Sequence, residues 1–212
     1  MRDKVWILGP CSLESRDLYF ECLESIRHEM HHTDNWYMKA SFDKANRTSL
    51  HGGRGPGLEE AKEVWAESKE LFPVVNIKKG QWLGPNNLVS SVDKIKETNS
   101  DCQAWITDRG SSFGYHDLFV NFGIVDELKE HYDKVILDCT HSTQRSRAVY
   151  GTQGDPVLAG RYFISSDLFE YDGVFAETHP RPEESVSDGE CLLPLGKMGY
   201  YITKAKSVGS FK

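Results

Sequence analysis

The sequence predicts an α/β fold: a shortened (β/α) barrel of the TIM type, with about six recognisable βα units instead of eight. Short apolar runs alternate with longer amphipathic stretches, which is the pattern of a parallel sheet covered by helices. The apolar runs are nearly continuous, as expected of strands buried on both faces. The 212 residues fall short of the roughly 250 that an eight-stranded barrel typically needs.

Six apolar runs are the predicted strands: Val5–Leu8, Trp36–Ala40, Val74–Ile77, Ala104–Thr107, Val135–Leu137 and Val174–Ala176. Between them, apolar residues recur at helical spacing over three stretches: Leu18–Met30, Leu58–Ser68 and Leu118–Leu128. Since no repeat, low-complexity tract or linker interrupts this pattern, we expect a single domain over residues 1–212.

Composition and charge exclude several classes of protein. The net charge of −7 disfavours nucleic acid as a partner. No stretch approaches the roughly 18 consecutive apolar residues of a membrane span, and the N-terminus lacks the pattern of a signal peptide. The five cysteines are far apart and form no CxxC pair, which argues against a disulfide framework or a zinc finger. We therefore expect a protein of the reducing cytoplasm.

A polar, chemically capable cluster follows each of the six apolar runs, at residues 9–12, 41–47, 78–81, 108–112, 138–142 and 177–180. In a (β/α) barrel the C-terminal ends of the strands converge on the face that carries catalytic groups. Turn chemistry alone would explain glycine, proline, aspartate and serine at these places. It does not explain lysine and arginine beside cysteine, histidine and glutamate. We therefore expect the six clusters to form one site.

Five basic residues stand in or beside these clusters: Lys39, Lys44, Arg47, Lys78 and Arg109. Like charges held close together are unfavourable unless anions neutralise them. Arginine offers phosphate a two-pronged contact, and lysine acts as a compact point charge. The set would suit two phosphorylated ligands, or one ligand with two anionic ends. The alternative is that these side chains are ordinary solvated loop charges.

Four further side chains form a candidate set of metal ligands: Cys11, His141, Glu177 and Asp188. A thiolate, an imidazole and two carboxylates suit a divalent transition metal such as Zn, Fe(II) or Mn. The ligands come from distant positions and not from one short motif. Taken singly, Cys11 could be a small buried residue and His141 a satisfied polar group.

Seven short segments of the chain resemble motifs of the 3-deoxy-D-manno-octulosonate 8-phosphate synthases, and they follow one another in the same order as in that family. The matching segments are residues 9–15, 39–49, 76–81, 108–115, 138–144, 177–182 and 187–189. The related 3-deoxy-D-arabino-heptulosonate 7-phosphate synthases usually have Lys-Pro-Arg-Thr where this chain has Lys44-Ala45-Asn46-Arg47-Thr48. The octulosonate family is therefore the better match.

The resemblance implies a cytoplasmic homo-oligomer of lipopolysaccharide biosynthesis that condenses phosphoenolpyruvate with arabinose 5-phosphate and releases phosphate. It implies substrate contacts from Lys39, Ser41, Lys44, Asn46, Arg47, Ser49, Lys78, Gln81, Arg109, Phe113 and Gln144. Within this set, the phosphoenolpyruvate ligands would be Lys39, Lys44, Lys78 and Arg109, and the sugar-phosphate ligands Asn46, Arg47 and Ser49. His141, Lys44 and Asn46 would be catalytic, and proton transfer would fall to His141 or to a water molecule on the metal.

The first-strand residue distinguishes metal-dependent from metal-independent members of the family. Cys11 stands where the metal-independent form has asparagine, so the resemblance implies a divalent metal held by Cys11, His141, Glu177 and Asp188. The metal would orient and polarise the aldehyde of the sugar.

The chain departs from the family pattern between its second and third apolar runs. The family's third and fourth strands are missing, and residues 71–79 read as the start of the third strand joined to the fifth. Asp108 stands where the family has glutamate. A closed barrel of six parallel strands would be too narrow for normal interior packing. The barrel is therefore open or rearranged, completed by a partner subunit, or the remnant of an enzyme that binds ligands without turnover. The heptulosonate activity is the other functional alternative.

Overall fold

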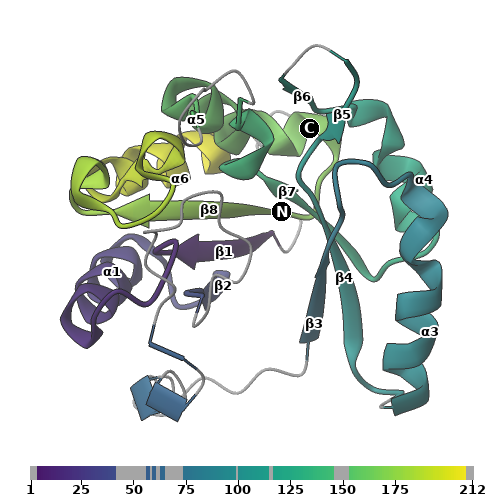
Figure 1. Cartoon of the computed structure of the whole chain (residues 1–212), viewed down its shortest axis with the longest axis horizontal. Coiled ribbons are helices and arrows are strands. Elements are labelled where there is room, and N and C mark those ends of the chain that lie inside the picture. The colour runs from purple at the N-terminus through teal and green to yellow at the C-terminus, as the bar shows by residue number, and fades with distance from the viewer. Residues whose placement is uncertain are drawn as a thin grey trace.

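A curled parallel sheet forms the centre of the molecule in a computed structural model, and helices cover its outer face (Figure 1). The structure describes residues 4–41, 56–57, 59–60, 63–64, 74–98, 100–114, 117–145 and 153–208. Four of the predicted site residues lie outside this part of the chain, namely Lys44, Asn46, Arg47 and Ser49. The helix predicted over Leu58–Ser68 also lies mostly outside it.

All six predicted runs are confirmed as strands. They are β1 (Val5–Gly9), β2 (Asn35–Met38), β3 (Val74–Lys78), β4 (Gln103–Asp108), β7 (Lys134–Asp138) and β8 (Gly173–His179). Their order in the sheet is β2-β1-β8-β7-β4-β3, and every pair is parallel. The two-residue strand β9 (Leu193–Pro194) pairs with the end of β8.

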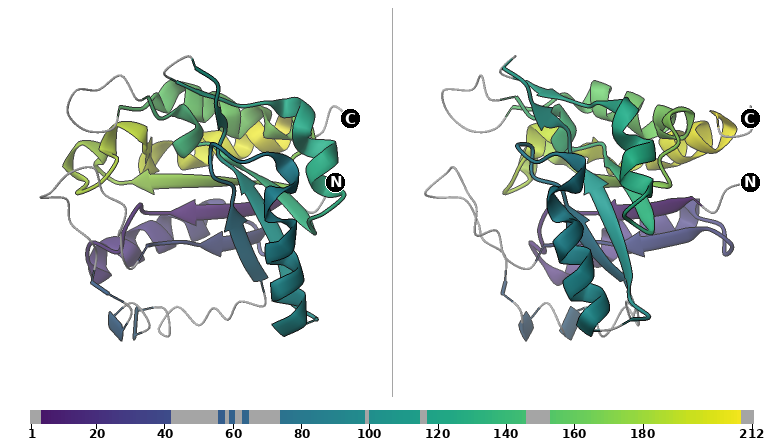
Figure 2. Two further views of the ribbon diagram at one scale, coloured as in Figure 1. Left: turned by 45° about the vertical axis from the view of Figure 1, so that its right-hand side comes forward. Right: turned by 90° about the vertical axis from the view of Figure 1, so that its right-hand side faces the viewer.

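The strand order is that of a barrel from which two neighbouring strands have been removed. The first and last strands, β1 and β8, pair with each other, as they would in a closed barrel. Among the described residues, β2 and β3 each pair with one strand only, so the sheet is open between them (Figure 2). The shortened barrel is therefore confirmed. A sheet that is open in this way agrees with all three alternatives: a functional open barrel, a barrel completed by a partner subunit, and a binding remnant.

The helices of the described residues lie outside the curled sheet (Figures 1 and 2). They are α1 (Arg16–Glu29), α3 (Val89–Thr98), α4 (Val125–Lys129), α5 (Pro156–Ser165) and α6 (Met198–Val208). Side-chain oxygens of Ser15 and Asp155 accept a backbone N–H in the first turn of α1 and of α5. None of the helices in the described part of the chain is long and apolar enough to cross a membrane.

Short 3-10 turns connect these elements, at η1 (Pro85–Leu88), η2 (Phe122–Ile124), η3 (His141–Thr143), η4 (Ser166–Phe169), η5 (Pro182–Glu184), η6 (Gly189–Cys191) and η7 (Leu195–Lys197). The helix predicted from Leu118 is wrong in its first turn. Residues Leu118–Phe119 form strand β6, which pairs antiparallel with β5 (Ser111–Ser112). The Asn121 side chain then accepts the N–H of Gly123 and starts the turn that leads into α4.

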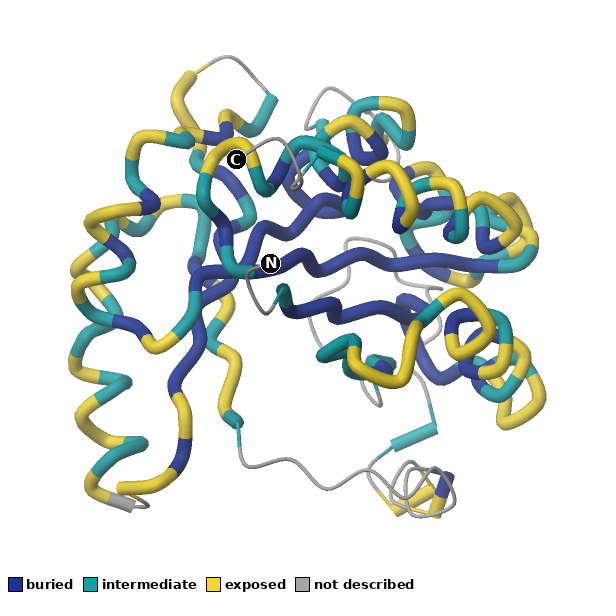
Figure 3. Tube along the Cα trace, turned by 180° about the vertical axis from the view of Figure 1, so that it is seen from behind, coloured by how far each residue is buried: buried dark blue, intermediate teal, exposed yellow. Residues whose placement is uncertain are grey.

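Apolar side chains fill both faces of the sheet, because successive residues of a strand point to opposite sides. Trp6 and Leu8 of β1 belong to the large core that α1, α5 and α6 complete, together with Ile26, Phe163 and Ile202. On the concave face, a smaller cluster contains Val5, Ile7, Trp105, Ile136 and Phe175. The tube in Figure 3 shows β1 and β8 buried along their whole length and β7 buried from its second residue on. This rigid sheet fixes the positions of the strand ends.

Candidate active site

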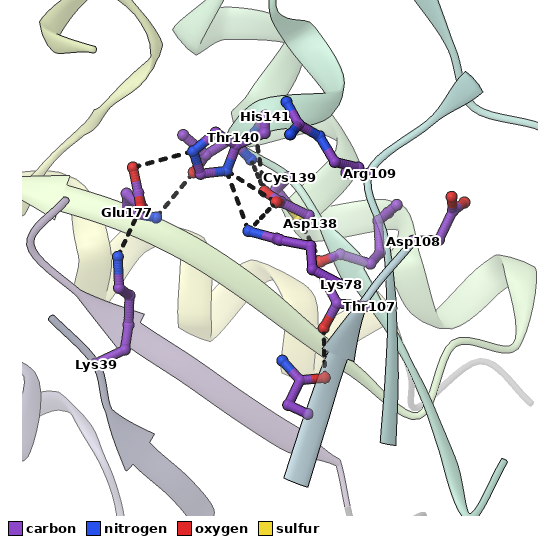
Figure 4. Close-up of polar contacts among 12 residues, drawn as sticks. Lys39, Lys78, Thr107, Asp108, Arg109, Asp138, Cys139, Thr140, His141 and Glu177 are labelled. Carbon is purple, nitrogen blue, oxygen red and sulfur yellow. Dashed lines mark hydrogen bonds and ion pairs between the residues drawn. The ribbon is translucent and has the colours of Figure 1, made fainter. Parts of the chain in front are cut away.

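Each of the six strands brings one of the predicted residues to the same end of the sheet. Cys11 and Lys39 follow β1 and β2, Lys78 ends β3, and Arg109 follows β4. His141 follows β7, and Glu177 lies near the end of β8. Figure 4 shows Lys39, Lys78 and Arg109 around the His141–Glu177 pair. The convergence expected from the sequence is therefore present for the described residues.

Gly9 allows the ends of β1 and β2 to approach closely. Its φ is +152°, and a Cβ atom at this position would lie 2.0 Å from the carbonyl oxygen of Lys39. Only glycine fits so close an approach. Just beyond it, the Lys39 ammonium donates to the Cys11 carbonyl over 3.4 Å. The predicted residue Ser41 forms a parallel bridge with Ser12, so it too lies beside Cys11.

Glu177 joins the cationic residues to the candidate metal ligands. Its Oε1 lies 2.6 Å from Nζ of Lys39, and its Oε2 lies 3.5 Å from Nε2 of His141. Its backbone N–H donates to Oγ1 of Thr140 over 2.8 Å. Glu177 is 1% exposed. A buried carboxylate is stable in such a place only when cations or donors surround it.

Asp138 belongs to the predicted strand-end cluster 138–142, but no role of its own was predicted for this residue from the sequence. Its buried Oδ2 lies 2.6 Å from Nζ of Lys78 and 2.8 Å from Nδ1 of His141. Its Oδ1 accepts the backbone N–H groups of Thr140 and His141. Burial works to raise the pKa of Asp138, but the charges and hydrogen bonds of His141 and Lys78 outweigh it and hold the pKa well below its usual range. Asp138 is therefore an anchor for both side chains.

Phe175 forms an aromatic floor beneath two of the lysines. The centre of its ring lies 3.7 Å from Nζ of Lys78 and 5.0 Å from Nζ of Lys39. A cation over a ring face is stabilised without the ring competing for an anion. The signal in the sequence was an aromatic residue at a concave-facing position of β8, two residues before Glu177.

Gln144 links Arg109 to Asp188. The Arg109 Nη2 group donates to Oε1 of Gln144 over 2.5 Å, and Nε2 of Gln144 lies 3.5 Å from Oδ1 of Asp188. The buried Nε of Arg109 has no acceptor among the described residues, so it can serve an anion. Asp188 has a φ of 53°, in the left-handed region, and its Oδ2 lies 3.6 Å from Sγ of Cys11.

Two predicted substrate contacts, Gln81 and Phe113, lie in or beside the β5–β6 hairpin. The carbonyl of Gln81 accepts the N–H of Ser112, so Gln81 belongs to the loop beside the β5–β6 hairpin. Phe113, in that hairpin, is 71% exposed, and its ring lies 6.5 Å from that of Phe119.

The four candidate metal ligands form two neighbouring pairs, Cys11–Asp188 and His141–Glu177. In the described part of the chain, no three cysteine, histidine, aspartate or glutamate side chains converge closely enough to hold a metal ion as they stand. The donor chemistry nevertheless fits a divalent metal. When Nδ1 of His141 donates to Asp138, its Nε2 presents a lone pair toward Oε2 of Glu177. A shared cation suits this arrangement.

The open α/β barrel and its strand-end cluster of cations, carboxylates and a thiol define a barrel protein with a site suited to anionic ligands. A sequence profile of the DAHP synthetase I family matches residues 2–72 and 63–210, and the chain belongs to this family. It is similar to the 2-dehydro-3-deoxyphosphooctonate aldolases of Shewanella halifaxensis and Shewanella piezotolerans. Each is 31% identical over 257 residues, which cover 97% of this chain and 90% of the relative.

These comparisons confirm the resemblance to the octulosonate phosphate synthases and do not favour the heptulosonate alternative. The comparisons also show where this chain is shorter than its relatives. The alignments run over more positions than the 212 residues of the chain. The profile is matched in two pieces that meet at residues 63–72, between β2 and β3. The sheet is open at the same place.

Proposed function

We propose that the chain condenses phosphoenolpyruvate with arabinose 5-phosphate to give 3-deoxy-D-manno-octulosonate 8-phosphate and inorganic phosphate. The observation that carries the proposal is the meeting of Lys39, Lys78, Arg109, His141 and Glu177, one from each of five strand ends, in one cluster. The names of the relatives support this choice of reaction. The cluster belongs to the part of the barrel that remains after the shortening.

Phosphoenolpyruvate carries a phosphate and a carboxylate, which the cations of the site would bind. Lys78 rests on Phe175 and on Asp138, so its position is fixed before a ligand arrives. Arg109 offers the planar donor group that suits a phosphate or carboxylate. Lys39, already directed into the cluster by Glu177, would supply a third positive charge. Holding the two reactants in a fixed orientation supplies much of the acceleration in such reactions.

A divalent metal would be held by Cys11, His141, Glu177 and Asp188, and when bound it would polarise the aldehyde of the sugar phosphate. Asp138 would keep Nε2 of His141 available as a ligand, because it accepts the proton on Nδ1. Lys39 would balance the charge of the Glu177 carboxylate from its other oxygen. Zinc, Fe(II) and Mn(II) all suit this ligand set.

The reaction forms one carbon–carbon bond and releases one phosphate. C3 of phosphoenolpyruvate attacks the aldehyde carbon, and the aldehyde oxygen takes up a proton, for which His141 and a water molecule are the candidate donors. Positive character develops at C2, where water adds. The added water gives up one proton as its oxygen bonds to C2, which balances the proton that the aldehyde oxygen takes up. The bond between C2 and the phosphate oxygen then breaks, and the remaining hydroxyl proton passes to the departing phosphate, which leaves a keto group and inorganic phosphate. The carboxylates beside the site, Asp138 and Glu177, stabilise positive character of this kind.

By resemblance, Asn46, Arg47 and Ser49 would position the sugar phosphate and Lys44 would join the ligands of phosphoenolpyruvate. Four further substrate contacts are assigned to neither substrate in particular: Ser41, Gln81, Phe113 and Gln144. Lys44 and Asn46 are also proposed to be catalytic. A homo-oligomer in the cytoplasm, serving lipopolysaccharide biosynthesis, belongs to the same proposal. Sedimentation of the purified protein tests the oligomer, because a monomer of 24.1 kDa would contradict it.

The deciding experiment measures phosphate release from phosphoenolpyruvate by the full chain supplied with Mn²⁺ or Zn²⁺. We expect release that requires arabinose 5-phosphate, stops with a chelator and returns with added metal. Erythrose 4-phosphate is the control sugar, and release with it alone would favour the heptulosonate activity. A folded protein that binds phosphoenolpyruvate without releasing phosphate would be a binding relic, and the proposed turnover would be wrong.

A further inference from the structure

A second charged group lies on the outer face of the sheet, behind the cluster of the active site. It consists of Lys79, Asp108 and Tyr171, each 1% exposed. Nζ of Lys79 lies 3.3 Å from Oδ1 of Asp108, and the Tyr171 hydroxyl donates to Oδ2 of Asp108 over 3.0 Å. Figure 4 shows Asp108 directed away from the residues around His141. The site as proposed uses none of these three side chains.

The group also ties two loops together. Lys79 donates to the carbonyls of Leu83 and Gly110 and to Oγ of Ser111, at 3.3 to 3.4 Å. Oδ1 of Asp108 accepts the N–H of Gly110 over 3.1 Å. The loop after β3 is thereby fastened to the turn after β4. Gly110 has a φ of +80°, so this turn has a conformation that glycine adopts most easily.

The covalent neighbours of this group are two of the proposed anion-binding cations. Lys79 follows Lys78, and Asp108 precedes Arg109. Because side chains alternate along a strand, the two cations point to the concave face while Lys79 and Asp108 point to the helices. A displacement of the buried pair would therefore move Lys78 and Arg109 relative to each other.

Burial of the Tyr171 side chain, with the neighbouring Asp108 carboxylate, raises the pKa of the Tyr171 hydroxyl. The hydroxyl thus stays protonated and remains a donor. A buried ion pair is weak support for stability, since apolar residues of similar volume often serve as well. Its directional contacts restrict the positions of its members more than apolar packing would.

We propose that Lys79, Asp108 and Tyr171 are positioning residues that set the separation of Lys78 and Arg109 for a ligand with a phosphate and a carboxylate. The inference rests on the proposed function, in which these two cations bind phosphoenolpyruvate. It predicts that damage to the outer group weakens binding of this ligand selectively. A group that served folding alone would lower stability and leave affinity in the folded protein unchanged.

The test is calorimetric titration of the full chain with phosphoenolpyruvate and, separately, with Mn²⁺. Tyr171→Phe removes one hydroxyl and should weaken phosphoenolpyruvate binding about 3- to 10-fold, and Asp108→Asn about 10- to 100-fold, with Mn²⁺ binding unchanged. Asp108→Glu keeps the charge next to Lys79 and should stay within about threefold of the wild type. Tyr132→Phe is the matched control, because the buried Tyr132 hydroxyl donates to the carbonyl of Pro85 and not to this group.

Unchanged phosphoenolpyruvate affinity in folded Tyr171→Phe would overturn the inference. Equal losses for phosphoenolpyruvate and Mn²⁺, or an equal loss in Tyr132→Phe, would also overturn it, because they indicate a general structural effect. If Asp108→Asn does not fold, Tyr171→Phe decides the question alone. Absence of phosphoenolpyruvate binding by the wild type would instead contradict the proposed function itself, so the two failures are distinguishable.

Discussion

Replacement of Asp138 by asparagine is the sharpest perturbation that the structure suggests. The Asp138→Asn side chain has the same shape, and its oxygen can still accept the two backbone N–H groups that Oδ1 now accepts. The negative charge that faces Lys78 at 2.6 Å and His141 at 2.8 Å is lost. The new amide donates where the carboxylate accepted, so Nδ1 of His141 must become the acceptor and Nε2 the protonated nitrogen.

Both stability and activity should fall. Hydrogen bonds to a charged group contribute about 1.5–3 kcal/mol each. The Lys78 side chain is 34% exposed, so solvent screening reduces the free energy that is lost with its ion pair to Asp138. We therefore expect a loss of about 2–4 kcal/mol, or a fall in Tm of about 5–15 °C for a chain of this size. Because Nε2 of His141 would no longer offer a lone pair, the rate of phosphate release should fall about 10²- to 10⁴-fold.

The matched control is Asp172→Asn. Asp172 also accepts a backbone N–H, from Val135 over 2.9 Å, and lies 3.6 Å from Nζ of Lys129, but it stands at the opposite end of β7. Its replacement should cost about 1 kcal/mol or less and leave phosphate release within about twofold of the wild type. Phosphate release and thermal unfolding are measured on both variants. Activity of Asp138→Asn within threefold of the wild type would refute the role given to this carboxylate.

Three further predictions concern replacement of single residues. Cys11→Ala should abolish stoichiometric binding of divalent metal and most phosphate release. Cys22→Ala should retain both, because Cys22 lies on the buried face of α1 in the core, and equal metal content in the two proteins would count against the ligand set. Gly9→Ala should lower the free energy of unfolding by about 3 kcal/mol, because the new Cβ would collide with the Lys39 carbonyl. Urea unfolding measures this change, and a midpoint equal to that of the wild type would be inconsistent with the close approach of the two strands. Burial raises the pKa of the Cys22 thiol from 9.0 to about 12. The protonated thiol therefore contributes to the free energy of unfolding in full below pH 9, and this contribution is lost as the pH rises toward 12. In urea unfolding between pH 8 and 11, the free energy of unfolding should fall less steeply with pH for Cys22→Ala than for the wild type.

The central strands β1, β7 and β8 were predictable from sequence because they are buried on both faces and read as continuous apolar runs. The edge strands β2 and β3 are only partly buried, although their sequences read the same way. The helix predicted from Leu118 failed for a local reason. Its apolar spacing fitted a helix, but backbone pairing of Leu118–Phe119 with Ser111–Ser112 and the turn at Asn121 prevailed over periodicity. A hairpin of two-residue strands is too short for an alternating pattern to appear in the sequence.

The cluster of the candidate active site was predictable to the extent that it follows from strand ends. Parallel strands bring their C-terminal ends together whatever residues they carry, which is why Cys11, Lys39 and Glu177 could be grouped before any contact was known. The role of Asp138 could not be derived in this way. Its importance depends on a rotamer that reaches Lys78 and His141 together, and that is a property of packing.

The central claim is that the strand ends of an open barrel form one site for phosphoenolpyruvate and a divalent metal. Anomalous X-ray diffraction from crystals grown with phosphoenolpyruvate and Co²⁺ tests it most directly. We predict one anomalous peak ligated by Cys11, His141, Glu177 and Asp188, with the phosphoenolpyruvate anion on Lys78 and Arg109 beside it. A metal bound elsewhere, or an anion outside the cluster above Phe175, would contradict the claim.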